Sequence, residues 1–223
     1  MATLFSESWT GSDLAVWDGG RWKNRHAQFN GAINILSNQG NLNCGTNAGE
    51  ANGYAFGQTI ESFGDFELTV DMTAQANTTG AADGHKVGVC FRGENDSMNP
   101  SGSGASYRIY FEWLATDTIY LQEKATTVWS TITSSVYSVA VNDVLHLVLR
   151  CEGSNIKFKV YKNAESVPES WLFDQTDTTL ASGSFAFQIF AGTDSTANSI
   201  RLDDMVVSSL TNPAVRPMRR SFA

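Results

Sequence analysis

Cysteine, histidine and proline are all scarce in this sequence: 223 residues include three cysteines, three histidines and four prolines. Cys44, Cys90 and Cys151 are widely separated. They resemble neither the close pairs of a zinc site nor the dense, even set of a disulfide-rich domain. We therefore expect three buried or half-buried thiols and a chain made in a reducing compartment.

Long apolar runs are also absent, and none approaches the about 18 residues that a membrane-spanning helix needs. The opening MATLFSESWTGSD has neither a basic nor an apolar stretch, so we expect no secretion signal. Positive charge is in deficit, with 15 Lys and Arg against 23 Asp and Glu, a net charge of −8. Such a chain lacks the basic footprint of a nucleic-acid-binding protein. We expect no nucleic-acid partner and no membrane insertion.

Period-two alternation of apolar and polar residues is what the sequence has in abundance. In LHLVLRCEGSNIKFKVYKN, alternating residues flank a Gly-Ser-Asn turn, which predicts a β-hairpin with one buried face. The strands predicted in this way are 33–36, 54–58, 66–72, 86–92, 107–113, 118–123, 144–151, 156–161, 184–190 and 199–207, with 128–133 as a weaker candidate. No long segment has a helical period, although 165–172 is expected to form a short helical turn. Many short strands without helices predict an all-β sandwich or jelly roll.

The domain organisation is expected to be simple. Residues 1–212 form one β-sandwich domain, within which residues 1–53 are looser strands and loops and the Asn- and Gly-rich stretch 37–54 is an irregular excursion. Residues 213–223 carry two of the four prolines and three arginines, Arg216, Arg219 and Arg220. Their composition predicts an extended tail outside the sandwich.

The strands around residue 110 divide into two faces, because alternate residues of a strand point in opposite directions. Tyr107, Ile109 and Phe111 are expected to form a core wall with alternate residues of the neighbouring strands. The opposite face is then predicted to carry Arg92, Arg108, Tyr110, Glu112, Tyr120 and Gln122. Aromatic rings and planar polar groups suit the C–H faces and hydroxyls of sugars. The alternative is an ordinary polar sheet face, stabilised by cross-strand Arg–Glu and Tyr pairs.

Three tryptophans, Trp9, Trp17 and Trp22, gather in the N-terminal region. A large indole ring serves either packing in a core or interface or a stacking platform for sugar. We favour packing, with the sugar platform as the alternative.

Several segments resemble concanavalin A-like lectin/glucanase jelly rolls, with laminin-G-like domains among the nearest. The segments that carry this resemblance are FGDFELTVDM, KVGVCFRGEND, SYRIYFEW, VNDVLHLVLRCEGSNIKFKVYKN, ASGSFAFQIFAG and SIRLDDMVVSSL. The resemblance covers about residues 54–210 and implies an antiparallel two-sheet jelly-roll sandwich. It says less about function, since this superfold hosts enzymes, lectins and structural domains.

Retaining glucanases of this superfold carry an E-x-D-x-x-E strand whose outer carboxylates do the chemistry. The nearest match, Glu94 to Asn99, ends in Asn and is followed by Pro100, so we predict a loop, no catalytic residues and no enzyme activity. Glu94, Asp96 and Asn99 are weak candidates for a calcium ion through oxygen ligands, because their spacing fits no fixed loop pattern. No cofactor is expected to be required.

The opening MATLFSESW also resembles the start of jelly-roll domains in minor tail proteins of bacteriophages. The prediction is a non-enzymatic virion structural protein, a minor tail, adsorption or capsid-decoration component, made in the host cytoplasm and located in the virion. Its expected partners are other virion proteins or copies of itself, with host surface glycans as a candidate ligand. The Arg216, Arg219 and Arg220 tail would order on an acidic neighbouring subunit, or is merely a solvated end. The alternatives are a cytoplasmic or non-classically released lectin and a degenerate glycosidase.

Overall fold

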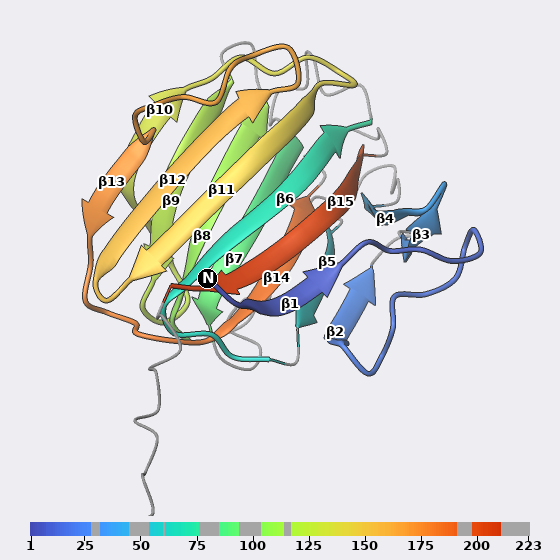
Figure 1. The fold of residues 1–223 in the computed structure, drawn as a ribbon, viewed down its shortest axis with the longest axis horizontal. Coiled ribbons are helices and arrows are strands. Elements are labelled where there is room, and N and C mark those ends of the chain that lie inside the picture. The colour runs from blue at the N-terminus through green and yellow to red at the C-terminus, as the bar shows by residue number, and fades with distance from the viewer. Residues whose placement is uncertain are drawn as a thin grey trace, which may run out of the picture.

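The computed structural model describes residues 1–27, 32–44, 54–59, 61–75, 85–93, 104–113, 117–190 and 198–210. These residues form two antiparallel β-sheets that lie face to face (Figure 1). The described part of the chain is all-β, and the predicted antiparallel two-sheet jelly-roll sandwich is confirmed.

The eight-stranded sheet lies in front in Figure 1, in the order β13-β12-β11-β6-β15-β4-β3, with β1 also paired to β15. Its strands are β1 (Thr3–Glu7), β3 (Ala32–Leu36), β4 (Gln39–Cys44), β6 (Phe66–Ala74), β11 (Val144–Glu152), β12 (Asn155–Lys162), β13 (Phe173–Thr176) and β15 (Asn198–Ser209). One edge of β15 pairs with β6, while β4 and then β1 share its other edge.

The seven-stranded sheet lies behind it, in the order β10-β9-β8-β7-β14-β5-β2. Its strands are β2 (Trp22–Ala27), β5 (Tyr54–Thr59), β7 (His85–Gly93), β8 (Ser106–Trp113), β9 (Thr118–Lys124), β10 (Trp129–Val136) and β14 (Ser184–Phe190). All its pairings are antiparallel. Its outer face, which points away from the viewer in Figure 1, carries the candidate site.

The core lies between the sheets and is filled by alternate residues of the strands. Tyr107, Ile109 and Phe111 of β8 are almost completely buried there, as predicted. The hairpin β11–β12 contributes a second buried row in perfect alternation. Each fully buried large apolar side chain stabilises the fold by about 1.5–3 kcal/mol, so period-two patterning determines which face of each strand turns inward.

The three N-terminal tryptophans are part of this core. Trp9, Trp17 and Trp22 are 2%, 1% and 1% exposed. Their ring centroids lie 4.7–5.9 Å apart, within the range of favourable aromatic pairing. Packing is therefore confirmed, and none of the three offers a sugar a free ring face.

All the strands expected from alternation are present, and four further strands were missed: β1, β2, β4 and β13. The irregular excursion expected at 37–54 was wrong over its first part, because β4 pairs there with both β3 and β15. Ser37 and Asn38 form the two-residue turn between β3 and β4, both with positive φ (55° and 56°), as a type I′ hairpin requires. The helical turn expected at 165–172 was also wrong, since these residues form bends and irregular backbone without a helix.

Candidate functional site

The strand register places a polar band on the outer face of the seven-stranded sheet. One cross-strand row runs Gln188, Gly88, Tyr110, Tyr120. The next row runs Ala186, Cys90, Arg108, Gln122, Thr131. Side chains in one row are direct cross-strand neighbours, about 4.5–5.5 Å apart at Cβ. We call this surface, with the adjacent Lys86, Glu112, Lys124 and Trp129, the outer-face site.

Five of the six residues predicted to share this face do so: Arg108, Tyr110, Glu112, Tyr120 and Gln122. The inclusion of Arg92 was wrong. Phe91 and Arg92 together stand opposite one residue of β14, which makes a β-bulge, and Arg92 has a positive φ of 51°. A bulge re-aims the side chains that follow it.

The re-aimed side chain of Arg92 is fully buried (0% exposed) and serves the structure. Its guanidinium donates to the backbone carbonyls of Gly153 (2.8 Å), Leu180 (3.1 Å) and Gly64 (3.3 Å). It also lies 3.6 Å from the carboxylate of Asp65. Arg92 thus holds three connecting segments at one end of the sandwich and is not available to a ligand.

Arg108 is the centre of the outer-face site. Its guanidinium carbon lies 4.1 Å from the centroid of the Tyr110 ring and 3.9 Å from that of Trp129, within the range of cation–π interaction with both. Its Nε donates to Gln122 Oε1 at 2.8 Å, and Gln122 Nε2 donates to Thr131 Oγ1 at 3.1 Å. Among the described residues, its two terminal amino groups have no hydrogen-bond partner. The side chain is therefore held in place with donors left over.

A second cation, Lys124, lies beside Arg108. Its side chain is fully buried, with Nζ 5.0 Å from the centroid of the Trp129 ring. Burial lowers the pKa of Lys124, and the charge of Arg108 lowers it further. Burial also lowers the pKa of Arg108. Burial is the leading cause of both shifts, and repulsion from a neighbouring cation adds to it only for Lys124.

Two buried polar atoms in this region make no hydrogen bond: Gln188 Oε1 and Trp129 Nε1. Gln188 lies over Gly88, where a Cβ would come within 2.8 Å of its amide nitrogen. That nitrogen contacts the Cys90 sulfur at 2.5 Å. An unmade buried hydrogen bond costs about 1–3 kcal/mol, and because both atoms are enclosed, neither is open to a ligand in this structure.

Sequence reasoning missed Trp129, Lys124 and Gln188. Trp129 begins β10, whose alternation is weak because most of its residues are at least partly exposed. The strand predicted at 118–123 ended one residue before Lys124, which is the last residue of β9. Alternation from Tyr120 and Gln122 would have placed Lys124 on the same face.

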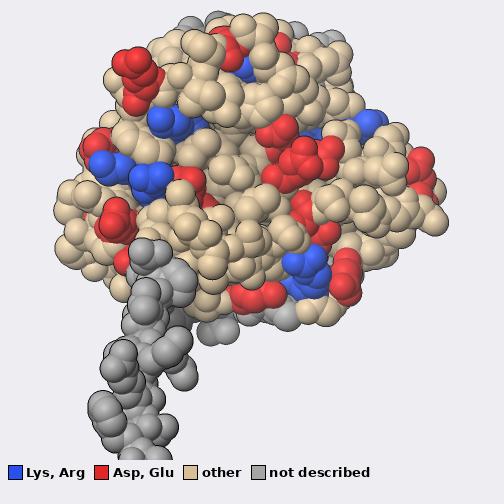
Figure 2. All heavy atoms as spheres, in the orientation of Figure 1, with Lys and Arg blue, Asp and Glu red and all other residues tan. Residues whose placement is uncertain are grey.

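The outer face of the eight-stranded sheet is different in kind, because its charges pair with one another. Figure 2 shows this surface, with acidic and basic side chains scattered over it in small neighbouring groups. Arg150 lies against Glu67 at 2.5 Å, Lys157 against Asp174 at 3.2 Å, and His146 against Asp71 at 2.6 Å. Such cross-strand pairs stabilise the sheet.

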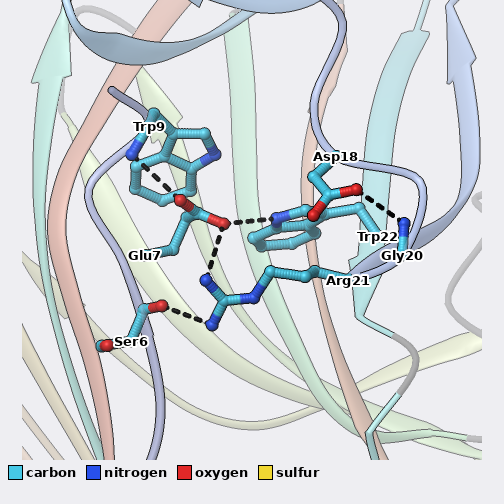
Figure 3. Close-up of polar contacts among 7 residues, drawn as sticks. All are labelled: Ser6, Glu7, Trp9, Asp18, Gly20, Arg21 and Trp22. Carbon is cyan, nitrogen blue, oxygen red and sulfur yellow. Dashed lines mark hydrogen bonds and ion pairs between the residues drawn. The ribbon is translucent and has the colours of Figure 1, made fainter. Parts of the chain in front are cut away.

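A hollow lies beside the end of β1, and the carboxylate of Glu7 lines it. The residues around it are Ser6, Glu7, Ser8, Thr10, Arg21, Asp204, Met205 and Val206. Figure 3 shows that Glu7 accepts hydrogen bonds from the backbone of Trp9 (3.1 Å) and the indole of Trp22 (3.2 Å) and pairs with Arg21 at 3.5 Å. Both carboxylate oxygens are thus occupied, which suits a residue that ties β1 to the aromatic core better than an acid or base.

Two sets of residues predicted from the sequence to form sites lie outside the part of the chain that the structure describes. They are the calcium candidates Glu94, Asp96 and Asn99 and the tail arginines Arg216, Arg219 and Arg220. In the described ranges, no three His, Cys, Asp or Glu side chains gather as a metal site. The same ranges contain no helix with the length and apolar character to cross a membrane.

No protein-family model matches the chain, and no curated protein matches its sequence. Solved structures do match. The carbohydrate-binding module CBM66 from Bacillus subtilis aligns with a TM-score of 0.60 and 15% identity, over 84% of this chain and 97% of that one. A β-1,3-glucanase from Mycobacterium marinum aligns with a TM-score of 0.60 and 11% identity, over 93% of this chain and 99% of that one. Peanut lectin in complex with a nine-residue peptide aligns with a TM-score of 0.58 and 12% identity, over 90% of this chain and 98% of that one.

These neighbours establish the fold: the chain has the concanavalin A-like jelly-roll fold that its sequence segments resemble. Identities of 9–15% carry the architecture alone. Function must be argued from the site, because this fold supports several unrelated activities.

Proposed function

We propose that this protein binds carbohydrate on the outer-face site and does not cleave it. The observation that carries the proposal is Arg108, fixed between the rings of Tyr110 and Trp129, bonded to Gln122 and holding donors that no described residue uses. Rings that stack on C–H faces, beside planar groups that bond hydroxyls, are the chemistry that sugars require. Neighbours described as a carbohydrate-binding module and a lectin support the same proposal.

The carboxylates of the site support binding without cleavage. A retaining glycosidase needs two carboxyl groups about 5–5.5 Å apart across the scissile bond. Over the described outer-face positions of β7 to β10 and β14, Glu112 is the single carboxylate, and Lys86 pairs with it at 3.1 Å. One acid held in an ion pair cannot supply both roles.

Tryptophan substitution tests the proposal with a matched control. Trp129 and Trp171 each stack against two cations, but on opposite outer faces: Trp129 against Arg108 and Lys124, Trp171 against Arg150 and Lys159. We expect a glycan array followed by calorimetry to show that Trp129→Ala weakens binding about tenfold or more, as for a central aromatic contact. Trp171→Ala should leave the affinity unchanged. Equal effects of the two substitutions, or none from Trp129→Ala, would contradict the proposal.

The virion role is a second, finer proposal. It is motivated by the opening MATLFSESW and the arginine-containing end. Sedimentation of particles from a lysate decides it: co-sedimentation of the protein would support a virion component, and recovery wholly in the soluble fraction would favour a lectin that acts alone.

A further inference from the structure

We propose that the ligand of the outer-face site is an acidic saccharide, whose carboxylate pairs with the guanidinium of Arg108. This inference rests on the proposed function and goes further, because it names the chemical class of the sugar. It follows from what Arg108 lacks, from the charge beside it, and from the geometry in which it is held.

Other arginines in the molecule show what Arg108 lacks. Arg21 lies 3.5 Å from Glu7, Arg92 lies 3.6 Å from Asp65, and Arg150 lies 2.5 Å from Glu67. Arg108 instead uses its Nε on the neutral amide of Gln122. Among the described residues no carboxylate pairs with Arg108, because Glu112, whose charge acts on it, is itself paired with Lys86 at 3.1 Å. A buried guanidinium without a bonded carboxylate gains most from an added anion.

Positive charge is concentrated at this spot even though the chain as a whole carries −8. The ammonium of Lys124 and the guanidinium of Arg108 both lie against the ring of Trp129, 5.0 and 3.9 Å from its centroid. The pKa of Lys124 is lowered in part by Arg108. The two cations together would attract a bound carboxylate, whereas a neutral sugar would gain nothing from their charge.

The geometry of Arg108 suits a planar anion. The two flanking rings and the bond to Gln122 fix the plane of the guanidinium, and the two terminal amino groups remain. A carboxylate accepts two parallel N–H···O bonds from such a fork. Because the arginine side chain is already ordered in the free protein, binding costs less conformational entropy, which favours affinity.

The rest of the saccharide also finds partners. The partly exposed ring of Trp129 offers a surface on which a C–H face of the sugar can stack. The partly exposed ring of Tyr120, 6.1 Å from that of Tyr110, extends the stacking surface. The site thus has one place for a carboxylate and, on Trp129 and Tyr120, aromatic surface for the C–H faces of the sugar.

Changing the ligand tests the inference without disturbing the buried arginine. Calorimetry would compare oligomers of galacturonate, glucuronate, mannuronate and guluronate, and sialylated oligosaccharides, with their methyl esters and with neutral oligosaccharides of equal length. We expect at least one free acid to bind tenfold or more tightly than its ester. Arg108→Gln should remove that difference, with thermal unfolding to confirm folding. Arg150→Gln, the matched arginine of the other sheet, should retain it.

The outcomes separate the two proposals. If neutral oligosaccharides bind as tightly as the acids, the proposed function stands and this inference is wrong. If no saccharide binds, both are wrong. Sulfated oligosaccharides serve as a further arm: tighter binding of sulfates than of any carboxylate would overturn the assignment of a planar carboxylate at Arg108.

Discussion

Two buried arginines on neighbouring strands, Arg92 and Arg108, have opposite roles. Arg92 is enclosed, and its guanidinium donates hydrogen bonds to three backbone carbonyls and pairs with Asp65. Arg108 is held by two rings and one amide, and its terminal amino groups are unused by the described residues. Their residue type and burial are alike, so it is the set of partners that separates a structural arginine from a binding one.

Arg92→Met is expected to lower the free energy of unfolding by about 3 kcal/mol or more, because the acceptors it serves lose their donor in a buried setting. Chemical denaturation would measure this. Arg150→Met, which removes a partly exposed ion pair (34% of the Arg150 side chain exposed), should cost no more than about 1 kcal/mol. A loss for Arg92→Met as small as that of the control would contradict the role assigned to Arg92.

At the scale of elements, the junction of β7 and β14 decides which side chains reach the outer face. The bulge at Arg92 turns that residue away, and Gly183 approaches it from the adjoining segment. Gly183 has a φ of +155°, and a Cβ there would lie 2.3 Å from the carbonyl carbon of Arg92. Only glycine allows this approach of two backbones.

Gly183→Ala is therefore expected to destabilise the fold by about 3 kcal/mol or more, since overpacking and an unfavourable φ add together. Gly64→Ala is the control, because a Cβ at Gly64 would have no neighbour within 4 Å. Urea unfolding of both variants would show the difference. Equal stabilities would mean that the close approach at Gly183 relaxes without cost.

At the scale of the whole molecule, burial of ionisable groups sets how stability depends on pH. Burial raises the pKa of Cys90 and Cys151 from 9.0 to about 12, and burial together with a bond to Asp177 raises that of Tyr107 from 10.0 to about 12. In the unfolded chain these groups lose their protons at lower pH than in the folded one. These three groups should then leave the free energy of unfolding unchanged below about pH 9 and lower it as the pH rises toward 12.

Thermal unfolding across this alkaline range would check the expectation. The double variant Cys90→Ala, Cys151→Ala should show a shallower fall of Tm with pH than the unchanged chain, whatever its absolute stability. An identical pH dependence would show that the two thiols do not contribute to the alkaline loss.

The sequence by itself determined eleven of the fifteen described strands, their inward faces and the jelly-roll class, since period-two alternation in β8, β11 and β12 reports directly which side chains leave water. It also placed five residues of the candidate site on one surface, because residues two apart in a strand share a face. Only the tertiary structure decided that Arg92 turns away, that Trp129 closes over Arg108, and that QGNLNC forms β4. Bulges, edge pairings and contacts between distant strands depend on partners far along the chain, and no local pattern records them.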